Sequence, residues 1–376
     1  MAKLGDIATY INGYAFKPQD WSDEGIPIIR IQDLTGNSYQ ANRYNGEYAS
    51  KYELNDGDVL ISWSASIGVY IWHGEKAVLN QHIFKVVFDK ERISKDFFVH
   101  QVGLILENAA SDAHGATMKH LTKPVFDALP FYLPPYEKQC EIAEVLDKVT
   151  SLISLRKQQL AKLDELIKAR FVEMFGDPVY NEMHWETKRL IDICRTIVDC
   201  PHSTPHYTTK DTGYKCIRTS AVKKNKILWE KVECISKQEY EERIKRKRPE
   251  KGDVIYTREG AILGIAAVID RDYNVALGQR SMLLSPDIYQ CTPCFLSMAM
   301  NFDSFLGKAL GGVSGSASPH INVGDIKALE IIAPPIEIQN QFATFVERVN
   351  QQKQTVQQSL EKLELMKKAL MQEYFG

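Results

Sequence analysis

Two long stretches of the chain carry apolar residues at steps of three and four, the spacing of one helix face. The first follows Pro134-Pro135 and ends at Phe175-Gly176, and the second follows Pro334-Pro335 and ends at Phe375-Gly376. A proline pair favours an extended segment before a helix, and a glycine is typical of a helix end. The pattern therefore predicts two long helices. Their apolar positions are Ile142, Val145, Val149, Leu160, Leu163, Ile167 and Met174, then Phe342, Phe345, Val349, Val356, Leu360, Leu363, Leu370 and Tyr374.

Neither helix is able to bury such a stripe alone, because the stripe continues over about five heptads. Each helix begins where a globular stretch ends, so we expect the two helices to pack antiparallel as a coiled coil. Charged residues also fall on the predicted seam, at Arg156, Arg170, Lys353 and Lys367.

The rest of the chain has the pattern of short strands that are bounded by Gly, Pro and Asp residues, with helices between them. A mixed α/β (α+β) fold with a curved sheet is predicted. The expected strands lie within 26–31, 59–63, 78–88, 216–219, 254–257, 261–269 and 281–284, and the expected helices within 95–110 and 293–310.

The two globular stretches repeat the same short motifs. Gly57-Asp58-Val59 matches Gly252-Asp253-Val254, and Asn80-Gln81 matches Gly278-Gln279. The offset between matching motifs grows from 186 to 200 residues along the chain, as duplication followed by changes in loop length would produce. We expect two similar domains with approximate twofold symmetry, and the predicted bounds are 1–135 and 178–335 for the domains and 136–177 and 336–376 for the helices.

The composition of the 376 residues is that of an ordinary globular protein, with 44% apolar and 25% charged residues. No apolar run approaches the length needed to span a membrane. Seven cysteines without regular spacing favour a reduced, cytoplasmic chain. Residues 1–135 hold 12 basic and 16 acidic side chains, whereas residues 178–335 hold 22 and 19, so the second domain alone is net basic.

Catalytic motifs are absent from the sequence, which has neither a phosphate-binding G-x-x-x-x-G-K-[ST] loop nor a G-x-G-x-x-G segment. Cys291 and Cys294 have metal-site spacing, but a second pair is missing, so buried structural cysteines are expected. The cluster from Cys200 to His206 contains two prolines and no nearby pair of carboxylates, which favours a shaped loop over a metal site. The chain is therefore predicted to be a binding protein with no catalytic residue, metal or cofactor.

Clustered cations in the second domain are candidates for phosphate contacts. The alternative is an ordinary solvated charged face. Five cations lie within residues 243–248, and three more follow the segment Arg218-Thr219-Ser220. In order, the candidates are Arg218, Thr219, Ser220, Lys223, Lys224, Lys226, Arg243, Lys245, Arg246, Lys247 and Arg248.

Loops at matching positions of the two domains carry different side chains, as expected if each domain reads different bases. Arg258 and Glu259 are suited to guanine and cytosine edges, respectively. The matched groups are Ser62, Ser64 and Ser66 with Thr257, Arg258 and Glu259; Arg30 and Gln32 with Arg218 and Ser220; and His114 and Thr117 with Ser314 and Ser316.

The Pro-Pro-x3-Gln motif followed by a long helix, present twice, resembles the specificity subunit of type I restriction-modification systems over essentially the whole chain. The Gly-Asp-Val/Ile strands and the segment from Val198 to Pro205 strengthen the resemblance. It implies two target-recognition domains, each reading one half of a split, asymmetric sequence in double-stranded DNA, with the helical pair acting as a ruler.

The resemblance also implies partners, namely two methyltransferase subunits and, in some systems, restriction subunits. S-adenosylmethionine would then be bound by the methyltransferase partner. Two other readings stay open. One is the DNA-reading subunit of a type IIB-like or methylation-only system, and the other is a two-domain coiled-coil scaffold that joins proteins without binding DNA.

Overall fold

The computed structural model describes residues 1–36, 42–64, 66–112, 122–260, 262–311 and 320–376. The chain divides into two compact units. Unit 1 comprises Met1–Gln158 and Gln357–Gly376, and unit 2 comprises Gln159–Val356. The division passes through both long helices, so each unit contains half of each.

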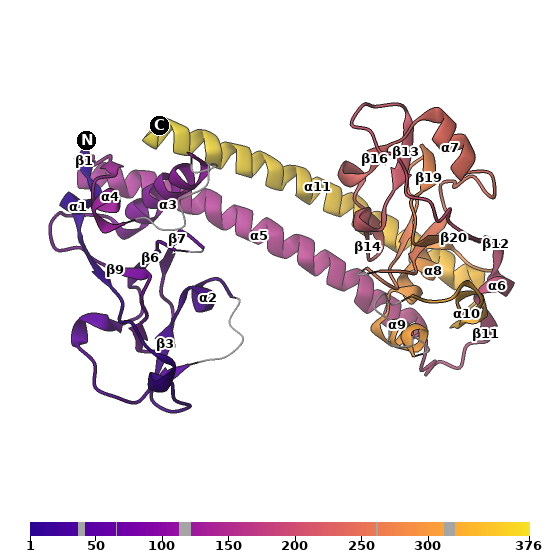
Figure 1. Cartoon of the computed structure of the whole chain (residues 1–376), viewed down its shortest axis with the longest axis horizontal. Coiled ribbons are helices and arrows are strands. Elements are labelled where there is room, and N and C mark those ends of the chain that lie inside the picture. The colour runs from indigo at the N-terminus through magenta and orange to yellow at the C-terminus, as the bar shows by residue number, and fades with distance from the viewer. Residues whose placement is uncertain (37–41, 65, 113–121, 261, 312–319) are drawn as a thin grey trace. The chain divides into compact units, whose positions relative to one another are not determined.

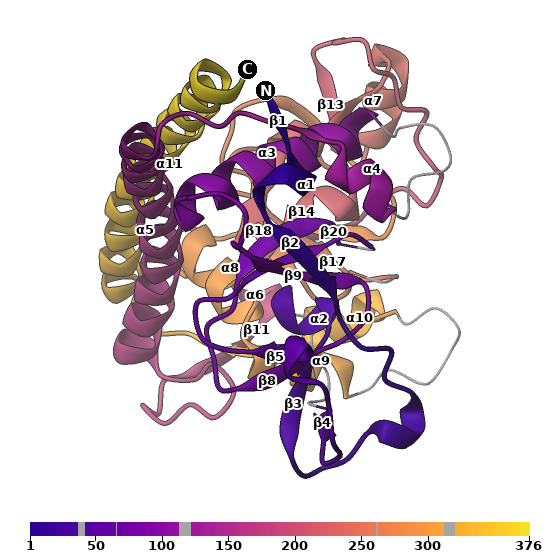
Figure 2. The same ribbon diagram turned by 90° about the vertical axis from the view of Figure 1, so that its left-hand side faces the viewer.

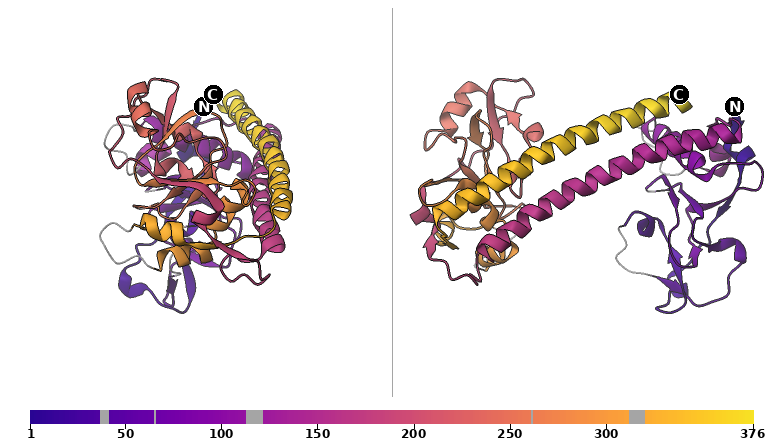
Figure 3. Two further views of the ribbon diagram at one scale, coloured as in Figure 1. Left: turned by 90° about the vertical axis from the view of Figure 1, so that its right-hand side faces the viewer. Right: turned by 180° about the vertical axis from the view of Figure 1, so that it is seen from behind.

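The two long helices are α5 (Tyr136–Phe175) and α11 (Ile336–Phe375), each unbroken over 40 residues (Figure 3). Both begin directly after the proline pairs. Gly176 follows α5 in the left-handed conformation, with φ of 72°, as expected of a helix-ending glycine.

In each unit the halves of α5 and α11 pack against each other in antiparallel directions. In unit 1, Lys157 pairs with Glu364 at 3.1 Å. In unit 2, Phe171 and Phe175 pack edge-on against Phe342, with ring centroids 5.4 and 5.5 Å apart. In unit 2 Lys353 also pairs with Asp164, and in unit 1 Ile142 and Leu146 share a core with Leu370 and Tyr374. Within each unit residue numbers therefore rise along α5 as they fall along α11, so the predicted antiparallel pairing is confirmed.

The predicted stripe is only partly buried. Ile142, Val149, Ile167 and Phe342 are buried, but Val145 is 37% exposed, so its assignment to the buried seam was wrong. Further apolar side chains outside the predicted stripe are exposed on α5 and α11, namely Leu152, Leu155, Leu166, Val172, Leu365 and Met366.

Unit 1 is built on two four-stranded sheets with a helical end. Figure 2 shows α1 (Leu4–Ile7), α3 (Lys95–Asp112) and α4 (Lys123–Asp127) at one end of the unit. The sheet next to them has the order β2-β9-β6-β7, and the other has the order β4-β3-β8-β5. The strands are β2 (Thr9–Asn12), β3 (Ile26–Ile29), β4 (Arg43–Tyr44), β5 (Glu53–Leu54), β6 (Val59–Ser62), β7 (Gly68–Ile71), β8 (Ala77–Leu79) and β9 (Ile83–Val87). A short pair, β1 (Ala2–Lys3) with β10 (Pro130–Phe131), and helices α2 (Ile31–Leu34), η1 (Pro18–Asp20) and η2 (Ser50–Tyr52) complete it.

Unit 2, whose elements are labelled in Figure 1, repeats most of this plan, but its second sheet has three strands, in the order β16-β13-β19. Its four-stranded sheet has the order β12-β20-β17-β18, matching β2-β9-β6-β7, and its parallel pair β13-β19 matches β3-β8. The strands are β11 (Thr187–Arg189), β12 (Cys194–Asp199), β13 (Tyr214–Ile217), β14 (Val222–Lys223), β15 (Lys226–Ile227), β16 (Glu233–Cys234), β17 (Val254–Thr257), β18 (Ala266–Val268), β19 (Asn274–Leu277), β20 (Ser281–Pro286) and β21 (Glu330–Ile332). The helices are α6 (Leu190–Ile193), η3 (Thr219–Ala221), η4 (Trp229–Lys231), α7 (Lys237–Arg243), α8 (Pro293–Met300), α9 (Asp303–Leu310) and α10 (Val323–Ala328).

The repeated glutamine of the Pro-Pro-x3-Gln motif fastens each long helix to its own unit. Gln139 is 1% exposed, donates to the Pro134 carbonyl and accepts from the backbone N–H of Ser94. Gln339 is fully buried and does the same with Pro334 and Thr292. Ser94 and Thr292 immediately precede α3 and α8, so the motif joins two helix starts in each unit.

Two predicted elements are each divided in the structure. The apolar run 78–88 forms β8 and β9 with a turn between them, because His82 takes a left-handed conformation. The helical stretch 293–310 forms α8 and α9, which are separated by Asn301 and Phe302. No helix in the described part of the chain is long and apolar enough to cross a membrane.

Candidate functional site

Three segments of unit 2 meet at the carboxylate of Asp199, the last residue of β12. The Arg258 guanidinium donates to its two oxygens at 2.9 and 3.0 Å, and His202 lies 3.0 Å from it. The backbone N–H of Arg258 donates to the carbonyl of Arg280 at 3.1 Å. We call this arrangement the Asp199 junction. It fixes the ends of β12 and β17 and the turn before β20.

Unit 1 has the same junction with other side chains. Its Asn12 is the last residue of β2, and it accepts from the indole N–H of Trp63 at 3.4 Å. The backbone N–H of Trp63 donates to the carbonyl of His82 at 3.3 Å. The strand registers identify these positions as equivalent, because Asn12 pairs with Phe84 as Asp199 pairs with Met282. The repeat thus conserves the backbone frame and changes the chemistry.

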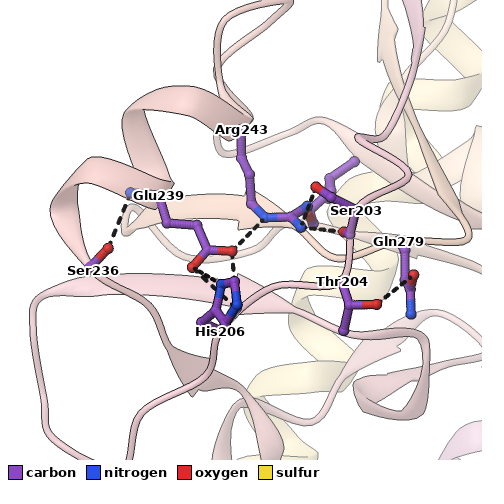
Figure 4. A network of polar contacts seen from close by, with 8 residues as sticks. Ser203, Thr204, His206, Ser236, Glu239, Arg243 and Gln279 are labelled. Carbon is purple, nitrogen blue, oxygen red and sulfur yellow. Dashed lines mark hydrogen bonds and ion pairs between the residues drawn. The ribbon is translucent and has the colours of Figure 1, made fainter.

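A second polar network holds the loop from Cys200 to His206 beside the Asp199 junction (Figure 4). The Arg243 guanidinium donates to the carbonyl of Ser203, and at 3.0 Å to that of Leu277. Glu239 lies 3.5 Å from the Arg243 Nε and accepts from the backbone N–H of His206 at 3.0 and 3.1 Å. The loop is therefore shaped by polar contacts to the largely buried side chains of Arg243 and Glu239, while the side chains of His202 and His206 stay 66% and 96% exposed.

Four of the predicted DNA contacts have buried side chains that bond within the protein. Arg243 is 6% exposed and bonded to backbone carbonyls, so its charge supports the loop and does not face a ligand. Arg258 is 7% exposed and satisfied by Asp199. Ser62 and Thr257 are fully buried in their sheets, with their hydroxyls bonded to the backbone of Ser64 and Ile265.

The rest of the basic run is more accessible but partly neutralised. Lys245 is exposed and pairs with Glu242 at 2.6 Å, and the half-buried Lys247 pairs with Glu250 at 3.0 Å. The Lys247 ammonium lowers the pKa of the Glu250 carboxyl below its usual range. Arg246 and Arg248 are exposed, and their hydrogen bonds go to neutral groups, the Asp199 carbonyl and the Asn274 amide. These two arginines are the better candidates for phosphate contacts.

The segment after β13 also presents cations. Arg218 is 49% exposed, pairs with Glu233 at 2.7 Å and stacks on the Tyr207 ring at 4.7 Å. Its hydrogen bond to Glu233 raises the pKa of the Arg218 guanidinium. Lys224 pairs with Asp303 at 2.8 Å. Of the other predicted contacts, Thr219 is half-buried and Ser220, Lys223 and Lys226 are exposed.

The predicted contacts of unit 1 form a smaller group. Arg30 is half-buried, lies 3.6 Å from Asp33 and stands 5.8 Å from the Trp21 ring. Gln32 is half-buried on α2. Ser64 is 9% exposed, whereas Ser66 is exposed. Glu259, the matching acidic candidate in unit 2, is 30% exposed and lies 3.9 Å from Arg280.

Four predicted contacts, His114, Thr117, Ser314 and Ser316, lie outside the described residues. Conversely, the structure adds side chains near the junction that were not predicted, namely His202, His206, Gln279 and Arg280. Thr204 donates to the Gln279 amide oxygen at 3.3 Å, which links the Cys200–His206 loop to the turn before β20. The repeated Asn-Gln and Gly-Gln pairs were the sequence signal for this turn, but they did not indicate which side chain would be exposed.

The thiols of the chain are mostly buried. All seven cysteines are free. Burial raises the pKa of Cys194, Cys216 and Cys294 to about 12 and that of Cys291 well above the usual range. Among the described residues, no group of three His, Cys, Asp or Glu side chains is placed to hold a metal ion.

Comparison with known proteins gives a consistent result. A family model described as "Type I restriction modification DNA specificity domain" matches residues 1–165 and 182–365. The EcoBI specificity subunit of a type I restriction enzyme from Escherichia coli is 25% identical, over 92% of this chain and 78% of that protein. The MjaVIII specificity subunit from Methanocaldococcus jannaschii is 23% identical, over 99% of this chain and 90% of that protein.

Solved structures share the fold. A crystal structure of the type I restriction-modification S subunit from M. genitalium superposes with a TM-score of 0.58 at 12% identity, covering 100% of this chain and 95% of that one. A chain from a structure concerning assembly and conformational transition of a type I restriction-modification system gives 0.57 at 16% identity, with 100% and 96% coverage.

Proposed function

The chain belongs to the family of type I restriction-modification DNA specificity domains, and we propose that it directs methyltransferase and restriction subunits to a split, asymmetric DNA sequence. Its own part in that activity is DNA-sequence specificity, a non-catalytic role. The target-recognition domains are residues 1–135 and 178–335, and the helical segments are 136–177 and 336–376.

The observation that carries this proposal is the pair of equivalent junctions, Asn12 with Trp63 and Asp199 with Arg258. Each holds the ends of strands and the following turn in the same frame while the side chains differ. A rigid frame that presents different polar groups in two copies is suited to reading two different half-sites.

Polar and charged side chains of both units supply the contacts to DNA. Phosphate contacts give affinity that depends on salt, whereas contacts to base edges give specificity. The members of the proposed set are Arg30, Gln32, Ser64, Ser66, Arg218, Thr219, Ser220, Lys223, Lys224, Lys226, Lys245, Arg246, Lys247, Arg248 and Glu259. His114, Thr117, Ser314 and Ser316 remain predictions.

The long helices have two roles, to separate the half-sites and to bind partner subunits. Each is 40 residues long, or about 60 Å at ~1.5 Å per residue, and each has residues in both units. We propose that they set the spacer between the half-sites. Their exposed apolar residues, such as Leu152 and Leu155, suit the binding of two methyltransferase subunits.

A reduced, cytoplasmic setting fits the seven free cysteines.

Selection from a pool of random DNA duplexes tests this function. The full chain, assembled with the methyltransferase subunits of its own system, is expected to enrich a motif with two specified parts and a fixed, unspecified spacer. Enrichment of no motif, or of one continuous motif, would contradict the proposal and favour a protein scaffold.

A further inference from the structure

His82 and Arg280 share a backbone conformation that side chains rarely adopt. Both have φ of 71°, in the left-handed region that favours glycine. They occupy equivalent places, each directly before the first residue of β9 or β20. Strain at a residue that is not glycine persists only where the surroundings hold it, and it points to a functional position.

The surroundings of Arg280 do hold it. Its carbonyl accepts from the backbone N–H of Arg258, whose guanidinium is fixed by Asp199. The preceding turn is tied at Gly278, whose backbone N–H donates to the Ile217 carbonyl at 2.8 Å. A side chain at position 278 would stand 3.0 Å from that carbonyl oxygen, so the turn lies close against the end of β13.

The Arg280 side chain is available to a ligand, in contrast to that of Arg258. It is 50% exposed, and its Nε lies 3.9 Å from an oxygen of the partly exposed Glu259. Such a long, exposed ion pair is weak and is readily exchanged for another partner. The cation therefore stands beside a carboxylate at the rim of the Asp199 junction, on a turn whose backbone is fixed.

We propose that Arg280 is a specificity-determining residue of unit 2, whose guanidinium reads the edge of a guanine in one half-site. This inference rests on the proposed function. Arginine matches the O6 and N7 acceptors of guanine with two parallel hydrogen bonds. Glu259 beside it is suited to accept from the amino group of a cytosine.

The repeat extends the inference to His82, which holds the equivalent position in unit 1. Its ring packs against that of Trp63, with centroids 4.9 Å apart, where unit 2 has the Arg258–Asp199 pair. A different side chain in the same strained position gives each unit its own base preference.

Arg280→Gly separates a reading role from a structural role. Glycine adopts the left-handed conformation without strain, so the variant should fold with an unchanged or higher melting temperature. In the random-duplex selection, the assembled complex should lose preference for a guanine at one position of one half-site. The expected loss is roughly 10-fold to 100-fold, with the other half-site unchanged.

Two further variants complete the design. Arg280→Asn tolerates the left-handed conformation and retains a side chain, so it should lose the same guanine preference without a freer turn. Arg271→Gln removes an exposed arginine that stacks on Trp229 and Tyr273 before β19, and the selected motif should not change.

The outcomes distinguish this inference from the proposed function. A wild-type complex that selects no motif overturns both. A wild-type motif that both Arg280 variants retain overturns only the reading role of Arg280. Uniformly weaker binding with a shallower salt dependence and an unchanged motif overturns it as well, since that result identifies a phosphate contact.

Discussion

The Arg258 guanidinium donates two hydrogen bonds to the carboxylate of Asp199, at 2.9 and 3.0 Å, with both side chains largely buried. This pair replaces the Trp63–Asn12 contact of the first unit at the equivalent position. The pair supports the turn that carries Arg280. Its loss should therefore lower the stability of unit 2, and it should alter DNA reading only indirectly, by displacing that turn.

Asp199→Leu should destabilise unit 2 by about 3 kcal/mol, because it leaves a buried guanidinium without its partner. The double variant Asp199→Leu with Arg258→Met should recover much of that loss, since neither charge remains. Urea unfolding of the full chain and both variants measures the free energies. Equal destabilisation by the single and double changes would contradict this prediction, because the unpaired guanidinium would then not be the cause of the loss.

Gln339→Met should lower stability by leaving three groups unsatisfied, the Thr292 N–H and the carbonyls of Pro334 and Gln290. Each buried unsatisfied group costs about 1–3 kcal/mol. Gln139→Met should act similarly in unit 1. Gln354→Met, at an exposed position of the same helix, is the matched control. Thermal melting that leaves the Gln339 variant indistinguishable from this control would contradict the role assigned to the motif.

The cations of the 243–248 run should separate into two classes. Arg246→Gln and Arg248→Gln should each reduce the slope of log affinity against log salt by about one, as expected for a lost phosphate contact. Arg243→Gln should instead lower the melting temperature, because Arg243 bonds the carbonyls of Ser203 and Leu277. The exposed Arg189, which pairs with Asp192, provides the control Arg189→Gln. A normal melting temperature with a reduced slope for Arg243→Gln would reverse this assignment.

Thiol labelling tests the core of the second unit. Thiolates react and thiols do not, and burial holds the pKa of Cys194, Cys216 and Cys294 near 12. At pH 8 the native chain should label rapidly at the exposed Cys140. At pH 9 the three buried thiols should still be almost entirely protonated, so they should still label slowly. The Cys140→Ser variant should lose the fast phase. Rapid labelling of Cys194 or Cys216 in this variant would show that the unit is not packed as described.

The sequence was most informative where spacing repeats. The proline pairs and the three-and-four periodicity predicted α5 and α11, because a helix face and its ends leave direct marks on residue order. Residue order did not indicate that Val145 would be exposed, since the width of a helix contact depends on what packs against it.

The DNA contacts stay a prediction, and the structure separates the predicted side chains by their accessibility. Glu259 and Arg246 lie where a ligand could reach them, but Arg243 and Arg258 are buried partners of Glu239 and Asp199. Residue order does not show which cations turn inward, because that depends on partners far along the chain, such as the Leu277 carbonyl for Arg243 and the Asp199 carboxylate for Arg258. Arg280 was not predicted, since its exposure follows from a left-handed turn before β20. The equivalent turn of the first unit was hidden in the sequence, because β8 and β9 resembled one apolar run.

Methylome sequencing tests the central claim, that this chain supplies the two-part DNA specificity of its system, most directly. Cells that carry the gene should show a methylated motif of two specified parts, and that motif should vanish when the gene is deleted. Replacing residues 178–335 with those of another family member should change one part of the motif and leave the other. A methylome that deletion of the gene leaves unchanged would contradict the account.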